Sequence, residues 1–269
     1  MPDNPSLNKR VLIAGALGVA LGFLAGFFLA NGINREEQEK LRAELGAARA
    51  GGGAQAGGPS GKAQQASQPG GGDEFPTLTD EQLQTAVKQA DADPSNAELQ
   101  HKVGQALYFY AWEKGNAQIL PEVARILKRA HSLDPKNYRT AVIAGDAHFL
   151  IATQSGDPKT LGEARKFYEA ALAQKPDDAQ VRTNLGRTYF FDRPSNPQRA
   201  IGEYRRALQA DPRQELSLQS LAAALIETGG TEEAARRLDE LEKVNPSNAE
   251  LPGLRAQFEQ KRNAAKEKQ

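Results

Sequence analysis

The sequence contains no cysteine among its 269 residues. This absence excludes thiol catalysis, cysteine-ligated zinc, covalent attachment of c-type haem and disulfide bonds. It leaves the compartment open, because a cysteine-free chain suits a reducing cytosol and an oxidising space equally well.

The chain also lacks net charge and is poor in aromatic residues. Its 34 basic residues balance 34 acidic residues, and aromatic residues make up 6% of the composition. A neutral chain has no electrostatic attraction to a polyanion, so no nucleic-acid partner is expected. Alanine, the best helix former, is abundant, which favours an all-α fold.

Motifs of known catalytic chemistry are missing as well. The sequence has no GxSxG, no P-loop, no HExxH and no GxGxxG after a strand pattern. Its three histidines, His101, His131 and His148, are scattered. We predict no enzymatic activity, no cofactor and no metal site, and a hydrogen-bonded structural role for His148 in the core.

One long apolar run is present near the N-terminus. Residues 11–30 contain no charged or strongly polar side chain, and their helical length matches a hydrocarbon core of about 30 Å. We predict a transmembrane helix over residues 11–32, after a short tail at 1–10. The alternative is a signal peptide cleaved after Gly32, but the run is longer than a usual signal-peptide core.

Small residues recur at every fourth position of this run, namely Ala14, Gly18, Gly22, Gly26 and Ala30. On a helix they form one stripe, which allows two backbones to approach as in GxxxG pairs. The stripe indicates a homodimer through the membrane. The alternative, which stays open, is that glycine and alanine are simply common in membrane helices.

The basic residues around the run indicate its orientation only weakly. Lys9 and Arg10 precede it, whereas the basic residues after it are mixed with glutamates. A short basic N-terminus before a first apolar span resembles a bacterial signal-anchor. We therefore expect a single-pass protein of the inner (cytoplasmic) membrane with the remainder in the periplasm.

The composition changes again after the apolar run. Residues 33–45 can extend the helix, and residues 46–76 are dominated by Gly, Gln, Ser and Pro. Such a segment cannot bury a core, so 46–76 is expected to be a flexible linker with a reach of roughly 30 Å.

A spaced pattern of small, aromatic, small and proline residues follows the linker. In GEARKFYEAALAQKP it falls on Ala164, Tyr168, Ala171 and Pro176. The same steps of four, three and five recur at Ala200, Tyr204, Ala207 and Pro212, at Ala234, Leu238, Leu241 and Pro246, and at Val123, Leu127, Ala130 and Pro135. From Pro94 onward the prolines are 41, 41, 36 and 34 residues apart, which indicates a repeat architecture.

Each copy follows an upstream segment with a small residue between larger ones, such as Leu185, Gly186 and Tyr189. Turn-forming residues, such as Ser195-Asn196-Pro197, separate the two segments and predict helical hairpins. We expect hairpins at 97–137, 138–178, 179–214 and 215–248, with capping helices at 79–92 and 249–266. The small residues allow the two helices of a hairpin to approach closely.

This pattern resembles the tetratricopeptide repeat, and its best copy is Leu185, Gly186, Tyr189, Ala200, Tyr204, Ala207 and Pro212. The resemblance implies an all-α solenoid of about four hairpins plus capping helices over residues 77–266. The first two units have 41 residues rather than 34, and about one extra turn on each helix would absorb the addition. His148 and Val123 stand where the family usually has an aromatic or leucine and an alanine.

By the same resemblance, the first helix of each hairpin lines a concave groove that binds peptides. The predicted peptide contacts are His101, Gln105, Tyr108, Phe109, Arg139, Asp146, Phe149, Arg187, Phe190 and Phe191. Four of the groove positions, Tyr108, Phe149, Phe190 and Ile226, would form an apolar row, one per repeat. The arginines Arg139 and Arg187 would hold carboxylates. Alternatively, the aromatic residues pack within their own lengthened hairpins.

The architecture is similar to that of the cytochrome c biogenesis proteins that carry an N-terminal anchor before such repeats. The expected function is a membrane-anchored scaffold that binds a protein or an extended peptide during envelope protein assembly or cytochrome c-type biogenesis. Two alternatives stay open: a soluble exported binding protein released after Gly32, and an accessory subunit of an enzyme complex.

Overall fold

The computed structural model describes residues 80–266. The predicted membrane span at 11–32 with its small-residue stripe, the helical extension at 33–45 and the linker at 46–76 all lie outside the described residues. None of the helices within 80–266 is long and apolar enough to cross a membrane.

The described residues form ten α-helices, one 3₁₀ helix and no strand, which confirms the all-α prediction for this part of the chain. The helices are α3 (Asp80–Ala92), α4 (Ala97–Lys114), η1 (Ala117–Ile119), α5 (Leu120–Leu133), α6 (Tyr138–Ser155), α7 (Pro158–Gln174), α8 (Ala179–Phe190), α9 (Pro197–Ala210), α10 (Glu215–Thr228), α11 (Thr231–Val244) and α12 (Leu251–Lys266).

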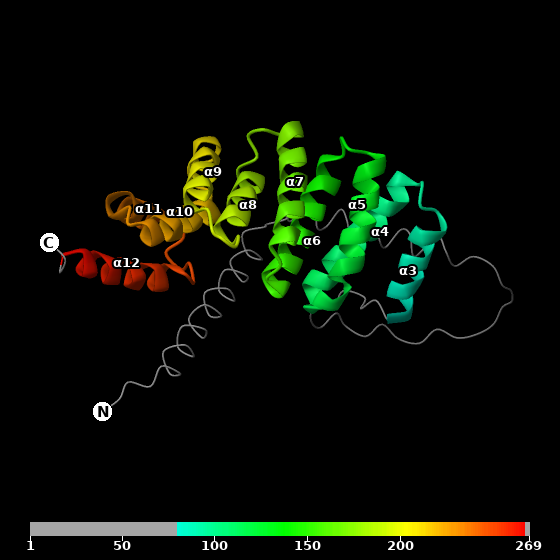
Figure 1. Cartoon of the computed structure of the whole chain (residues 1–269), viewed down its shortest axis with the longest axis horizontal. Helices are drawn as coiled ribbons and strands as arrows, with labels where there is room; N and C mark the ends of the chain where they lie inside the picture. The colour runs from blue at the N-terminus through cyan, green and yellow to red at the C-terminus, as the bar shows by residue number, and fades with distance from the viewer. Residues whose placement is uncertain (1–79, 267–269) are drawn as a thin grey trace, which may run out of the picture. The chain divides into compact units, whose positions relative to one another are not determined.

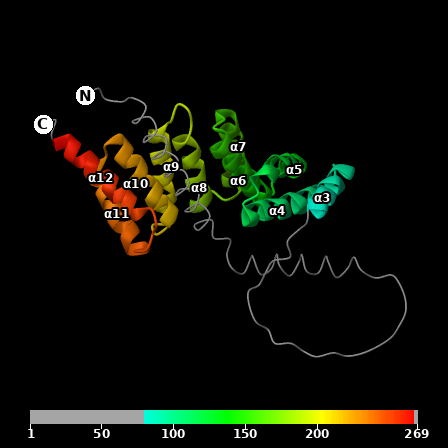
Figure 2. The ribbon, with the colours of Figure 1, turned by 90° about the horizontal axis from the view of Figure 1, so that it is seen from below.

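The helices follow one another in chain order from α3 to α12, as both views show (Figure 1 and Figure 2). Four antiparallel hairpins, α4–α5, α6–α7, α8–α9 and α10–α11, each pack on the next. The first helix of each hairpin also contacts the first helix of the next, and α12 continues this series by packing on α10 and α11. One hairpin cannot bury its apolar face alone, so the core runs between neighbouring hairpins.

Helix ends follow from local sequence chemistry. The side chains of Asn137, Asp157 and Asp178 accept hydrogen bonds from backbone N–H groups in the first turns of α6, α7 and α8. At the other end, Gly115 and Gly156 close α4 and α6 in the left-handed conformation, with φ of 62° and 69°.

The close approach of paired helices rests on glycine. Cβ atoms placed on Gly145 and Gly186 would lie 2.6 Å from the Cε1 atoms of Tyr168 and Tyr204, respectively. Both tyrosine rings are fully buried, with 0% and 1% of their surface exposed. Each small residue of a first helix therefore makes the space that the aromatic residue of the second helix fills.

The seven added residues of the first two units are accommodated in two ways. In the second unit both helices are longer, since α6 has 18 residues and α7 has 17, against 14 each for α10 and α11. In the first unit α4 has 18 residues, but α5 has only 14 and follows η1. Pro121 in the first turn of α5 has no N–H to extend the helix backwards, so the preceding residues form a 3₁₀ turn.

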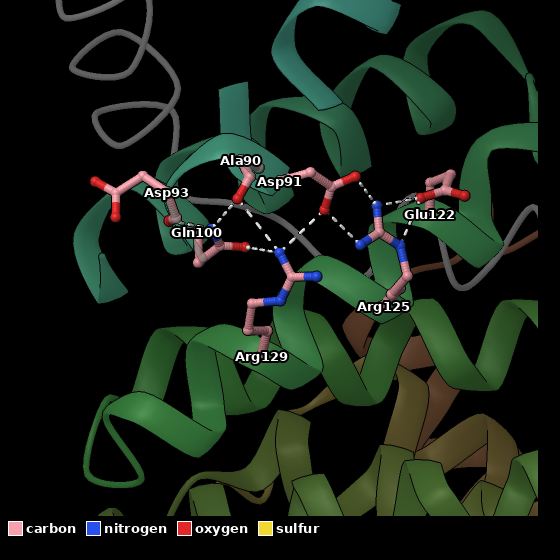
Figure 3. Close-up of polar contacts among 7 residues, drawn as sticks. All are labelled: Ala90, Asp91, Asp93, Gln100, Glu122, Arg125 and Arg129. Atoms are coloured by element: carbon pink, nitrogen blue, oxygen red, sulfur yellow. Dashed lines mark hydrogen bonds and ion pairs between the residues drawn. The ribbon is translucent and has the colours of Figure 1, made fainter. Parts of the chain in front are cut away.

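Helix α3 is held on the first hairpin by a polar network (Figure 3). The carboxylate of Asp91 accepts two hydrogen bonds from Arg125, at 2.6 and 2.9 Å, and one from Arg129 at 3.0 Å. The buried Gln100 donates from Nε2 to the carbonyl oxygens of Ala90 and Asp93. These contacts satisfy carbonyl groups at the end of α3, which has no helix on its other side among the described residues.

Candidate functional site

Three phenylalanines connect the interior of the solenoid to its surface. Phe149 on α6 is fully buried, and its ring centroid lies 6.0 Å from that of Phe191. The Phe191 ring lies 5.5 Å from that of Phe190, the last residue of α8. Both Phe190 and Phe191 are half-buried. The aromatic series therefore ends at the surface on Phe190.

Phe190 opens onto a cleft between the end of α8, the helix α10 and the helix α12. The cleft has a volume of about 270 Å³, and we call it the α10–α12 cleft. Its apolar lining residues are Phe190, Ala223, Ile226 and Leu254. Its polar lining residues are Glu227, Glu250, Gln257, Gln260 and Lys261. An apolar lining beside polar and charged side chains is the composition of a site for an amphipathic ligand.

Two carboxylates line the cleft, those of the exposed Glu227 and the half-buried Glu250. The side chains of Glu227 and Glu250 form no hydrogen bond or ion pair with another residue of 80–266. Burial raises the pKa of Glu250 above its ordinary value. Elsewhere on the domain, Glu203 pairs with Arg182 and Arg206. A half-buried carboxylate without an ion-pair partner beside an apolar surface, as at Glu250, favours a cationic ligand.

The ten predicted peptide contacts divide into two groups by burial. The buried ones are Gln105, Tyr108, Asp146, Phe149 and Arg187. The half-buried ones are His101, Phe109, Arg139, Phe190 and Phe191. In the apolar row, Tyr108, Phe149 and Ile226 are buried, whereas Phe190 is half-buried. Of the ten, only Phe190 lines the cleft, and the peptide contacts stay a prediction.

Two predicted peptide contacts near the start of the solenoid, His101 and Gln105, form hydrogen bonds with other residues of the chain. The Nδ1 atom of His101 on α4 lies 2.7 Å from the hydroxyl of Thr140 on α6. The Gln105 amide oxygen, turned toward α6, accepts from Arg139 Nε at 2.8 Å and from Nη2 at 3.1 Å. These pairs join neighbouring first helices, so Arg139 already contributes to the packing of the first two hairpins.

Asp146 and Arg187 lie in a buried polar cluster between the second and third hairpins. The Asp146 carboxylate accepts from the Tyr168 hydroxyl at 2.7 Å and from the Asn184 amide at 3.2 Å. Burial raises the pKa of Asp146 to about 7, although these hydrogen bonds and the charge of Arg187 oppose the shift. The guanidinium of Arg187 stacks 4.7 Å above the Phe149 ring. The cluster joins α6, α7 and α8, and it is enclosed.

The histidine positions agree with structural roles. His148 is buried, its Nδ1 lies 2.9 Å from the Ala144 carbonyl oxygen, and burial lowers its pKa. Its ring packs on Phe167, as does that of His131. No group of three or more potential metal ligands occurs among residues 80–266.

Sequence reasoning missed the contribution of α12, which was expected only to cap the solenoid. The signal was present in the repeat period. Shifting Ala223 and Glu227 by the last interval of 34 residues gives Gln257 and Lys261, and all four line the cleft. The helix α12 thus continues the register of the first helices, and Leu254 forms part of its apolar face.

Comparisons with known proteins agree with this architecture. Residues 195–258 match the family model of the tetratricopeptide repeat. Two solved structures, both titled as crystal structures of MamA, are each 22% identical in sequence, with TM-scores of 0.51 and 0.50. They match 64% of this chain and 91% and 85% of their own chains. No curated protein sequence matches the chain.

The helical hairpins and their glycine–aromatic packing are similar to those of helical-repeat solenoids, and residues 195–258 match the tetratricopeptide repeat. The likeness to the MamA structures is one of fold alone at this level of identity. The candidate site of this chain is the α10–α12 cleft, whose lining includes the carboxylates of Glu227 and Glu250.

Proposed function

We propose that this chain is a non-enzymatic protein–protein interaction scaffold that holds an extended peptide segment of a partner. The α10–α12 cleft carries the proposal, because Phe190, Ile226 and Leu254 supply apolar surface beside polar side chains that lack partners within the domain. Stacked repeats expose such surfaces along the series of first helices. Apolar contacts would supply affinity, and the polar side chains would orient the peptide.

A photocrosslinking experiment tests the scaffold function. Benzoylphenylalanine at the exposed Gln257, which lines the cleft, is expected to capture one reproducible partner in cells. The same group at the exposed Arg236 on α11 serves as the control, because that side chain lies away from the cleft lining. Mass spectrometry of the captured product identifies both partner and segment. Equal capture at both positions, or none at Gln257, contradicts a role for the cleft.

We further propose that the scaffold is anchored by residues 11–32 in the inner membrane, with the repeats in the periplasm at the end of the 46–76 tether. The support is the length of the apolar run and the composition of the tether. The small-residue stripe suits a homodimer through this span. The alternative of a released protein is tested by N-terminal sequencing of the mature chain, since a sequence that begins at Ile33 rejects the anchor.

Within the envelope, we propose a role in protein assembly or cytochrome c-type biogenesis. The support is the order of a span, a tether and helical repeats, which is a likeness of architecture. Haem staining of membrane and periplasmic fractions from a deletion strain tests it. Loss of all c-type cytochromes supports a role in their biogenesis. Unchanged cytochromes leave two candidates, general envelope assembly and an accessory subunit of an enzyme complex. Co-purification from detergent extracts distinguishes these two.

A further inference from the structure

We propose that the α10–α12 cleft selects a peptide segment that carries apolar residues next to lysine or arginine. This inference deepens the scaffold function proposed above and rests on it. It names the chemistry of the segment, an apolar anchor beside a cationic side chain, and the residues that recognise each part.

The apolar part of the cleft is suited to side chains of a peptide. A volume of about 270 Å³ lies just below the usual range for small-molecule sites, which begins at about 300 Å³. Ile226 and Leu254 are themselves buried, each with 3% of its surface exposed, so they form a fixed wall. Phe190 and Ala223 are half-buried and leave room above that wall. One or two apolar side chains would cover this surface.

The charged part of the cleft favours a cation. Two carboxylates, those of Glu227 and Glu250, line the cleft against one ammonium group, that of Lys261. Lys261 forms no ion pair with either carboxylate within the described residues. Glu250 is half-buried, so its ionised form has lost part of its hydration without gaining a partner. A cation bound there would restore the missing interaction.

The two arginines of α12 do not neutralise the cleft. Arg255 donates to Asp239 and Glu242 on α11, at 3.0 and 2.6 Å. Arg262 pairs with Glu259 of its own helix. Both arginines are therefore occupied away from the two cleft carboxylates, and the acidic excess at the cleft stays available to a ligand.

The probes are three fluorescein-labelled peptides of eleven residues in a glycine–serine background. The first carries two leucines alternating with two lysines, the second has glutamates in place of the lysines, and the third has serines in place of the leucines. Fluorescence polarisation measures their binding to the full chain in phosphatidylcholine nanodiscs. Empty nanodiscs of the same composition supply the blank, and zwitterionic lipid avoids electrostatic attraction of the lysines.

The leucine–lysine peptide is expected to bind, and each of the other two to bind at least about tenfold more weakly, because each lacks one of the two recognised parts. The double variant Glu227→Gln, Glu250→Gln is expected to lose about tenfold in affinity for the first peptide and most of its salt dependence. The matched control Glu81→Gln, Glu232→Gln removes two exposed carboxylates elsewhere and is expected to change neither. Ala223→Phe fills the cleft and is expected to abolish binding, with circular dichroism as the check on folding.

The outcomes separate the two proposals. Tighter binding of the leucine–glutamate peptide, lost in Ala223→Phe, overturns the cationic preference and leaves the scaffold function standing. Binding of the first peptide that is unchanged in both the Ala223→Phe and the double glutamine variants places recognition elsewhere and overturns this inference. Failure of all three peptides, together with no capture at Gln257 in cells, overturns the inference and the scaffold function together.

Discussion

Replacing Gly186 with alanine is expected to lower the free energy of unfolding by about 1 to 3 kcal/mol, the usual cost of overfilling a packed core. The added methyl group would lie 2.6 Å from Cε1 and 2.8 Å from Cδ1 of Tyr204, whose ring is enclosed and cannot move aside freely. The gain in helix propensity from glycine to alanine, about 1 kcal/mol, offsets part of this cost. Thermal unfolding followed by circular dichroism measures the change.

The matched control is Gly202→Ala on α9. No heavy atom lies within 4 Å of the Cβ that this change adds, and the backbone there is helical. Only the propensity gain remains, so this variant is expected to be more stable by up to about 1 kcal/mol. Equal stabilisation by both alanines would show that the third hairpin does not close on Tyr204 as described.

Replacing Asp146 with asparagine is expected to change the pH dependence of stability. Because burial raises the folded-state pKa of Asp146 from 3.8 to about 7, the folded chain holds a proton that the unfolded chain releases in this range. The contribution of Asp146 to stability is therefore full below about pH 4 and is lost as the pH rises to 7. The rise in the pKa of Asp146 corresponds to about 4 kcal/mol in the free energy of unfolding.

Asparagine cannot ionise, and its side-chain oxygen can still accept from Tyr168 and Asn184. The free energy of unfolding of the variant, minus that of the natural chain, is thus expected to rise by about 4 kcal/mol as the pH goes from 4 to 8. Urea unfolding of both chains at several pH values gives this difference. The pH dependence that comes from His101, His131, His148 and Glu250 is common to both chains and therefore cancels. A difference that stays constant with pH would mean that Asp146 is ionised in the folded state, held by Arg187.

The helical hairpins were predictable because their causes are local. Pro176 and Pro212 must follow helix ends, Asp157 is a strong N-cap, and a period near 34 to 41 residues requires stacked units. The lengthened second unit followed from the same count. The 3₁₀ turn before α5 did not, because several ways of placing seven residues around Pro121 agree with the same sequence pattern.

The candidate site was predictable only in part. Spacing places Tyr108, Phe149 and Phe190 at equivalent positions of successive first helices, but it does not tell which of them a neighbouring helix covers. The Phe191 ring and the Arg187 guanidinium pack on the buried Phe149, whereas α8 ends at Phe190 and that ring is half-buried. Residues at equivalent positions of successive repeats therefore differ in how much of their surface is exposed.

The sequence alone was enough to predict helical hairpins in a row and small residues that let their paired helices approach closely, and it shows an apolar run and a segment rich in Gly, Gln, Ser and Pro before them. These properties depend on backbone propensity, capping and periodicity, which act over a few residues. Only the tertiary structure shows that α12 forms one side of a cleft, that Glu227 and Glu250 line it without an ion pair to Lys261, and that Asp146 and Arg187 are enclosed. Those properties depend on distances between side chains from separate helices, which only the packing of the hairpins fixes.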